Sequence, residues 1–310
     1  MNNIRNDVKS PSSQPKKIDF NELALLKVPS NELSACSKGS PYIICNEQQQ
    51  DQTIQGLKML FAKDAKLPTV HIGFSLWFNL DLLSETNMQY AILFDIDKNV
   101  LALYQLIHEI LKDNAINTPE KFLHALFDRL KTDKENLSFY PIEYLEEELA
   151  KQLRQPTGFL SSVNNFLKVK NMFQEGKIFY GHVDLTDVDK IQQVSNWCKK
   201  NNLKIATLYI SNIPEWIVEN KKTRKDQLIQ SITLLTQDDT MIIDAFYPTT
   251  QKKGSGPPQR MCLAKTFNSD RFKKTIAKGY FNSGPSNLID SDDETSETNK
   301  ASSNFNAKKK

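Results

Sequence analysis

Short apolar runs alternate with helical patterns through the middle of the chain. Each run is five to seven residues long and rich in Val, Ile, Leu and aromatic residues, and three of the runs are followed directly by Asp or Ser, which is typical of buried strands. The runs are Thr69–Gly73, Tyr90–Phe94, Lys177–Val183, Lys204–Ile210 and Thr240–Phe246. The pattern therefore predicts strands spread from residue 69 to residue 246.

The segments between these runs have the period of amphipathic helices. Apolar residues recur at the spacing of one helical face from Val100 to Leu111, and Pro119–Leu130 has a similar face with Thr118 as its expected N-cap. Thr186 followed by Asp189 predicts a capping box for the next helix. A further helix is expected at Asp226–Leu235. Because strands separated by helices run parallel with right-handed crossovers, the chain predicts a doubly wound, mostly parallel sheet in a three-layer α/β/α fold.

Composition divides the chain into one expected domain and two tails. Residues 1–17 and 283–310 are rich in Asn, Ser, Lys and acidic residues and lack the apolar content of a core. We expect both to be disordered, with a single domain at 18–282 that carries a helical insertion at about 114–173. The acidic and polar C-terminal tail also resembles, by composition, the export signals of type IV secretion effectors.

Charge and cysteine content give no sign of a nucleic-acid partner, a disulfide framework or a metal site. The net charge is +3, from 40 basic and 37 acidic residues, so the chain gives no clear nucleic-acid signal. Its four cysteines lack C-x-x-C spacing, and no histidine pair has the spacing of a helical metal site, so we expect neither a disulfide framework nor a metal. Without an apolar signal region or a membrane-spanning run, a cytoplasmic protein is expected, which leaves open a signal-peptide-independent route into a host cell.

Polar residues and one glycine follow the expected strands where a doubly wound sheet binds its ligands. They are Gly73, Phe74 and Ser75 after the first strand, Asp95 and Asp97 after the second, Asp184 after the third, and Ser211 and Asn212 after the fourth. Asp95 lies 22 residues beyond Gly73 (95 − 73), a spacing at which a carboxylate accepts hydrogen bonds from ribose hydroxyls. This arrangement predicts a nucleoside pocket.

Each candidate also has a purely structural interpretation. Gly73 is equally typical of a turn, and Asp95 and Asp97 are equally typical of N-caps for the helix that follows. Asp184 is also compatible with a turn before Thr186, and Asn212 with the start of a short helix around Pro214. The joint placement of the candidates at strand ends is what favours a ligand site.

Several segments resemble one bacterial family. Val70–Phe74, Ala91–Asn99, Phe122–Arg129 and above all Tyr209–Trp216 are similar to an uncharacterised bacterial family with a class I S-adenosylmethionine methyltransferase-like Rossmann sheet. The resemblance spans about residues 67–248. It implies an S-adenosylmethionine cofactor held by the residues named above and transfer of its methyl group to an unknown acceptor, for which a protein is one candidate. Ser211 and Asn212 would lie beside the reacting end.

The chain departs from the family pattern at the first loop. A second glycine is absent after Gly73, and Phe74, Leu76, Trp77 and Phe78 put bulk where the cofactor would pass, with Asn79 as the remaining polar candidate. A non-catalytic interaction module, such as an effector that binds a host protein, is therefore an alternative. A nicotinamide-dependent oxidoreductase is a third interpretation, weakened because the chain has no glycine-rich turn for a pyrophosphate.

Overall fold

The computed structural model describes residues 18–28, 44–61, 67–132, 142–218, 222–245 and 256–267. The two expected tails, 1–17 and 283–310, lie outside the described residues, so their expected disorder stays a prediction. Within the described part, no helix is both long enough and apolar enough to cross a membrane.

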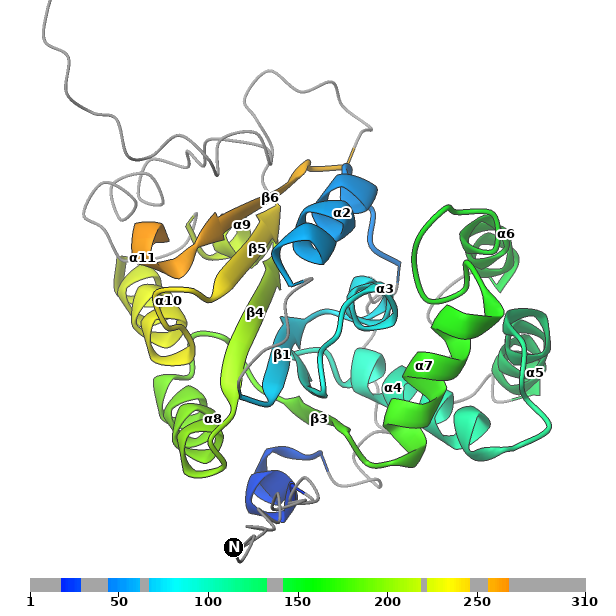
Figure 1. The fold of residues 1–310 in the computed structure, drawn as a ribbon, viewed down its shortest axis with the longest axis horizontal. Coiled ribbons are helices and arrows are strands. Elements are labelled where there is room, and N and C mark those ends of the chain that lie inside the picture. The colour runs from blue at the N-terminus through cyan, green and yellow to red at the C-terminus, as the bar shows by residue number, and fades with distance from the viewer. Residues whose placement is uncertain are drawn as a thin grey trace, which may run out of the picture.

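A twisted sheet of six strands forms the centre of the fold (Figure 1). The strand order is β3-β2-β1-β4-β5-β6, in which neighbouring strands of the first five run parallel and β6 runs antiparallel to β5. The bounds are β1 Thr69–Phe74, β2 Tyr90–Asp95, β3 Ile178–His182, β4 Lys204–Ser211, β5 Met241–Ala245 and β6 Gln259–Leu263. The order reverses between β1 and β4, which is the switch point at which such sheets bind ligands.

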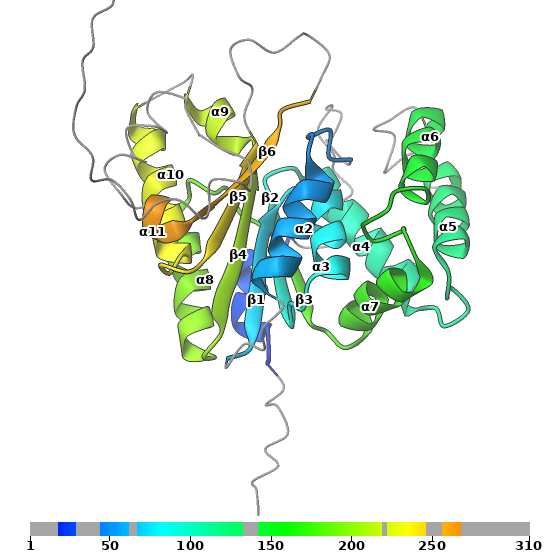
Figure 2. The same ribbon diagram turned by 45° about the horizontal axis from the view of Figure 1, so that its top comes forward.

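Helices cover both faces of the sheet (Figure 2). One face packs against η1 (Asn21–Leu26), α8 (Val188–Lys200), α10 (Lys222–Leu235) and α11 (Ala264–Phe267). The other packs against α2 (Gln50–Leu60), α3 (Trp77–Glu85) and α4 (Lys98–Lys112). Alternate side chains of each strand point to opposite faces of the sheet. Val70 and Ile72 of β1 point into the first core, and Ala91 and Leu93 of β2 point into the second. The fold is thus the expected three-layer α/β class.

Three helices lie between α4 and β3, the region in which a helical insertion was expected. They are α5 (Pro119–Thr132), α6 (Ile142–Gln152) and α7 (Val163–Gln174), and a short helix α9 (Ile213–Val218) follows β4. The Thr118 hydroxyl accepts a hydrogen bond from the Lys121 N–H at 3.4 Å, in the manner expected of an N-cap. Helix α7 packs on α3 and α4, so these helices extend the second core.

Helix α3 replaces the crowded turn expected after β1. Every residue from Trp77 to Ser84 is buried, and Trp77 packs against Phe159, with the two ring centroids 6.0 Å apart. A helix that is buried on all sides has no amphipathic period to reveal it, and here the polar residues Asn79 and Asp81 are buried with the apolar ones. The bulky side chains that follow the first strand therefore fill the core.

Candidate functional site

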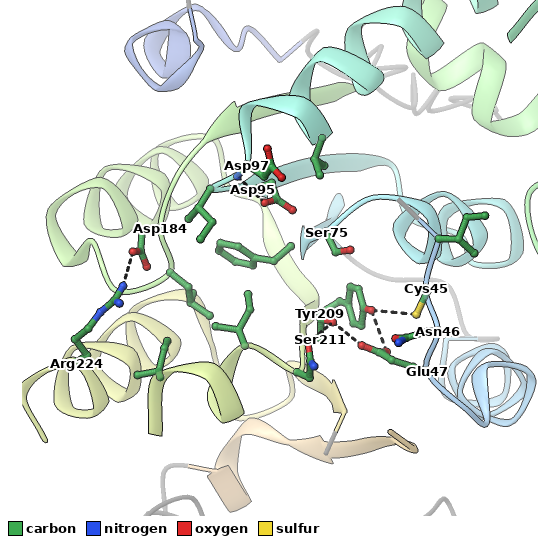
Figure 3. Close-up of a pocket in the computed structure, with 18 residues that line it drawn as sticks. Cys45, Asn46, Glu47, Ser75, Asp95, Asp97, Asp184, Tyr209, Ser211 and Arg224 are labelled. Atoms are coloured by element: carbon green, nitrogen blue, oxygen red, sulfur yellow. Dashed lines mark hydrogen bonds and ion pairs between the residues drawn. The ribbon is translucent and has the colours of Figure 1, made fainter. Parts of the chain in front are cut away.

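A pocket of about 430 Å³ opens at the carboxyl ends of β1, β2 and β4, beside the switch point (Figure 3). Its size is within the usual range for small-molecule sites. Seven of the eight residues expected at a cofactor site line it: Phe74, Ser75, Asp95, Asp97, Asp184, Ser211 and Asn212. Leu76, Trp77 and Phe78 do not line it. The structure thus brings together residues that lie up to 138 positions apart (212 − 74), and their role in binding stays a prediction.

Gly73 serves the core beneath the pocket. A Cβ atom at this position would lie 1.9 Å from Asn79 Oδ1 and 2.7 Å from His71 Nε2, which are themselves hydrogen-bonded at 2.9 Å. Because Asn79 Nδ2 donates to backbone carbonyls, its Oδ1 is the acceptor, and His71 must carry its proton on Nε2. His71 Nδ1 then accepts from the Thr207 hydroxyl at 2.7 Å. The glycine leaves room for this buried network.

The same network holds the first loop in an unusual conformation. Ser75 has φ 78°, in the left-handed region that favours glycine. Its carbonyl oxygen accepts from Asn79 Nδ2 and from the Tyr104 hydroxyl, each at 2.8 Å. Burial lowers the pKa of His71 to about 4, so the ring is neutral and the network carries no charge. Ser75 thus takes the backbone shape that a glycine-rich loop would supply.

Asp95 and Asp97 have different structural roles at the end of β2. Asp97 is the N-cap of α4, because its carboxylate accepts from the Asn99 N–H at 2.9 Å, which was one of the structural alternatives. Asp95 Oδ1 accepts from the Asp97 N–H at 2.8 Å. Burial raises the pKa of the Asp95 carboxyl to about 7, although that N–H opposes the rise. Between them, the Ile96 side chain lines the pocket and is 62% exposed.

The Asp184 carboxylate is already engaged by donors of the protein. Its Oδ1 accepts from the N–H and the hydroxyl of Thr186, both at 2.8 Å, and its Oδ2 accepts from Arg224 at 2.7 Å. The sequence predicted Thr186 as the N-cap of α8, and this prediction is wrong, because the Thr186 hydroxyl donates to Asp184. Asp187 takes that position and accepts from the Lys190 N–H. Arg224, in α10, lines the pocket.

The opposite wall comes from a segment that sequence reasoning missed. Residues 45–48 precede α2 and run beside β6, where Gln48 donates its N–H to Pro257 and accepts from the Gln259 N–H, both at 2.9 Å. We call residues 45–48 the strap. Its Glu47 is 6% exposed and lines the pocket. Nothing in the local pattern Cys45-Asn46-Glu47-Gln48 distinguishes this acid from those of a polar loop.

Glu47 is held by hydroxyl and amide donors from two strands. Its Oε1 accepts from the Ser211 hydroxyl at 2.5 Å, and its Oε2 accepts from the Tyr209 hydroxyl at 3.0 Å and from Gln259 Nε2 at 2.6 Å. Burial raises the pKa of Glu47 from its ordinary value, while the three donors oppose the rise. Ser211, expected beside the reacting end of the cofactor, where it and Asn212 would be the candidates for a catalytic group, is thus engaged with Glu47 and has φ 51°.

The pocket carries a negative charge. Four carboxyl groups line it, from Glu47, Asp95, Asp97 and Asp184, and Arg224 is the cationic side chain among the described lining residues. Because Arg224 pairs with Asp184, the remaining acids are not neutralised by it. In the described part of the chain, no group of three or more His, Cys, Asp or Glu side chains has the arrangement of a metal site. The pocket therefore favours a ligand with positive charge over one with phosphates.

Fold and pocket define an α/β protein of the doubly wound, Rossmann-like class. A family model matches residues 42–278, so the chain belongs to the family described as Domain of unknown function (DUF7790). No curated protein matches the chain. Among solved structures, it is similar to the rRNA methyltransferase aviRa from Streptomyces viridochromogenes, with 13% identity, 80% of this chain and 94% of that chain covered, and a TM-score of 0.37. The fold class rests on the strand order.

Proposed function

We propose that the pocket binds S-adenosylmethionine and that the protein transfers the methyl group of this cofactor to an acceptor. The observation that carries the proposal is the set of carboxyl groups around one cavity at the switch point, with its one described cation already paired. S-adenosylmethionine bears a nucleoside, a sulfonium cation and an amino-acid group, and when bound it would supply an electrophilic methyl group. Such a ligand matches the charge and the size of this pocket.

The lining residues fit a nucleoside in two ways. The Asp95 carboxylate has lone pairs beyond the one that faces the Asp97 N–H, and these would accept hydrogen bonds from ribose hydroxyls. Ile96 exposes an apolar side chain and Leu185 also lines the pocket, so a purine ring would find apolar surface there. Desolvating such surface contributes about 25 cal/mol per Å². Asp184 contributes less to a ligand than expected, because Arg224 and Thr186 already engage it.

Charge disfavours a nicotinamide dinucleotide. Its pyrophosphate needs a helix N-terminus or a glycine-rich turn with free N–H groups. Here the first loop presents Ser75 and then enters a buried helix, and the rim beyond it carries Asp95 and Asp97. Repulsion between phosphates and these acids weighs against that ligand.

Isothermal titration calorimetry tests the proposal directly. Wild-type protein should give heat with S-adenosylmethionine and with S-adenosylhomocysteine, and none with NAD⁺. Asp95→Ala should weaken both interactions at least tenfold, whereas Asp128→Ala, on the exposed face of α5, should leave them unchanged. No heat with either methionine-derived ligand in the wild type would end the proposal.

The alternative of a non-catalytic interaction module rests on the first loop, where Ser75 stands in place of a glycine. This alternative predicts no methyl transfer from labelled cofactor to any protein in a lysate, together with cofactor-independent binding of a partner. It includes an exported effector that acts on a host protein, for which the C-terminal tail is the sequence argument. The acceptor of a methyl group, a protein or otherwise, stays a hypothesis.

A further inference from the structure

The Glu47 carboxylate has one lone pair still open. A carboxylate offers about four acceptor positions on its two oxygens. Two of those on Oε2 are taken by Tyr209 and Gln259, and one on Oε1 is taken by Ser211. The Cys45 thiol lies 3.5 Å from the Tyr209 oxygen and also faces Glu47, but a thiol is a weak donor and leaves room for a stronger one. The open position lies on Oε1, and the residue lines the pocket.

The surroundings of Glu47 cost folding free energy. All three donors are uncharged, so a carboxylate that is 6% exposed lacks a cationic partner among them. Gln259 turns its Nε2 toward Glu47, and its buried Oε1 has no hydrogen-bond partner in the described structure. The left-handed backbone conformation of Ser211 is also unfavourable for a residue other than glycine. Three unfavourable features at one place indicate a site kept for a ligand and not for stability.

Glu47 lies across the pocket from Asp95. Figure 3 shows Asp95 and Asp97 on one side of the cavity, the strap with Tyr209 and Ser211 on another, and Ser75 between them. A ligand whose ribose binds Asp95 would therefore extend past Ser75 toward Glu47. The part of the ligand that reaches the strap should offer a hydrogen-bond donor and a positive charge.

We propose that Glu47 binds the α-ammonium group at the amino-acid end of the cofactor. This inference rests on the proposed function, and it assigns to the strap the polar contact that the first loop does not provide. The ammonium donates to the open position on Glu47 Oε1 and supplies the cation that this buried carboxylate lacks, in a charge-assisted hydrogen bond. Removing that charge from either the ligand or the protein should therefore give the same loss of affinity.

Four ligands test the assignment by calorimetry. S-adenosylmethionine and S-adenosylhomocysteine carry the ammonium, a deaminated S-adenosylhomocysteine lacks it, and 5′-methylthioadenosine lacks the whole amino-acid part. The wild type should bind S-adenosylhomocysteine at least tenfold more tightly than the deaminated ligand. This comparison needs no variant, so it holds even if Glu47 substitutions fold poorly.

Variants then separate the two ends of the pocket. Glu47→Gln should weaken both ammonium-bearing ligands at least tenfold and change 5′-methylthioadenosine less than twofold. Asp95→Asn, as the matched variant at the ribose end, should weaken all four ligands by a similar factor. Glu47→Asp, which keeps the charge on a shorter side chain, should retain part of the preference for the ammonium.

The outcomes distinguish this inference from the proposed function. If the wild type binds 5′-methylthioadenosine but does not prefer S-adenosylhomocysteine over its deaminated form, the inference fails and the nucleoside site stands. An equal loss for all ligands in Glu47→Gln would likewise overturn it, because it would indicate a structural role. If the wild type binds none of the four ligands, both proposals fail together.

Discussion

Asp95 combines burial with a position at the rim of the pocket, and this should make ligand affinity depend on pH. Its pKa of about 7 means that near neutrality a large share of the carboxyl is protonated in the free protein. Ribose hydroxyls donate best to the ionised form, so S-adenosylhomocysteine should bind about tenfold more tightly at pH 8 than at pH 6. Calorimetry at both pH values measures this, and Asp95→Asn should remove the change. Equal affinity at the two pH values in the wild type would contradict it.

Gly73 should be intolerant of a side chain although it does not line the pocket. In Gly73→Ala the new methyl group would collide with Asn79 Oδ1 and displace it from His71. Overpacking and a broken buried network together should cost about 2–4 kcal/mol of unfolding free energy. Urea denaturation measures this cost.

Gly176→Ala is the matched control for that substitution. Gly176 has φ +67° and no atom within 4 Å of an added Cβ, so it should lose about 1 kcal/mol, from backbone strain alone. A cost at Gly73 no larger than that at Gly176 would show that Asn79 and His71 move aside without penalty.

At the scale of single residues, sequence could identify the rim of the pocket but not its opposite wall. The candidates at strand ends were found because strand ends are visible in the apolar pattern and meet at one edge of a parallel sheet. Glu47 gave no such signal, since its three partners are 162, 164 and 212 positions away. The loop conformation of Ser75 likewise depends on Asn79 and Tyr104 and not on its neighbours.

At the scale of elements, the five parallel strands were predictable because each is a compact apolar run. Strand β6 was missed because it begins with Gln259 and Arg260, residues atypical of a buried strand. Arg260 is accommodated by an ion pair with Asp244 of β5 at 2.6 Å, in a pairing that only the folded sheet creates. Helix α3 was missed because it is buried on all sides, so its polar residues Asn79 and Asp81 mark no exposed face and the helix lacks an amphipathic period.

A buried acid at the junction of α3 and α7 should make stability depend on pH. Asp81 is 4% exposed, accepts from the Phe159 N–H at 2.7 Å, and has a pKa raised by burial to about 7, with Glu85 and Asp51 adding to the rise. The folded state therefore holds a proton that the unfolded chain releases near pH 4. The contribution of Asp81 to stability is fully present below that pH and is lost as pH rises through 7, by an upper bound of about 4 kcal/mol.

Asp81→Asn isolates this contribution from that of other acids. The amide oxygen keeps the hydrogen bond to Phe159 and cannot ionise, so the variant should be more stable than the wild type at pH 8 and close to it at pH 4. Thermal unfolding at the two pH values measures the difference. Since Asp95 contributes with the same sign, the wild-type profile alone does not decide the matter. An unchanged difference between pH 4 and pH 8 in Asp81→Asn would contradict the assignment.

At the scale of the whole molecule, the pocket is formed by the sheet, its flanking helices, the loops at the strand ends and the strap. Both cores and every lining residue lie between residues 18 and 267. The family match begins only at residue 42, yet Phe20 stacks on Trp197 with ring centroids 4.9 Å apart, and Leu23 and Leu26 are buried. The segment before the family match is therefore part of the first core.

Two truncated chains should separate the domain from the residues outside it. A chain of residues 18–282 keeps all described packing, so it should unfold within about 2 °C of the full-length protein and bind S-adenosylhomocysteine equally well. A chain of residues 42–282 covers the family match but loses the partly buried Phe20 and the buried Leu23 and Leu26, and should be less stable by about 3–6 kcal/mol, at 1.5–3 kcal/mol for each buried leucine. Thermal unfolding and calorimetry measure both effects. Equal stability of the two truncated chains would show that η1 contributes nothing to the free energy of unfolding. A longer chain less stable than the full-length protein would show that the domain extends beyond residues 18–282.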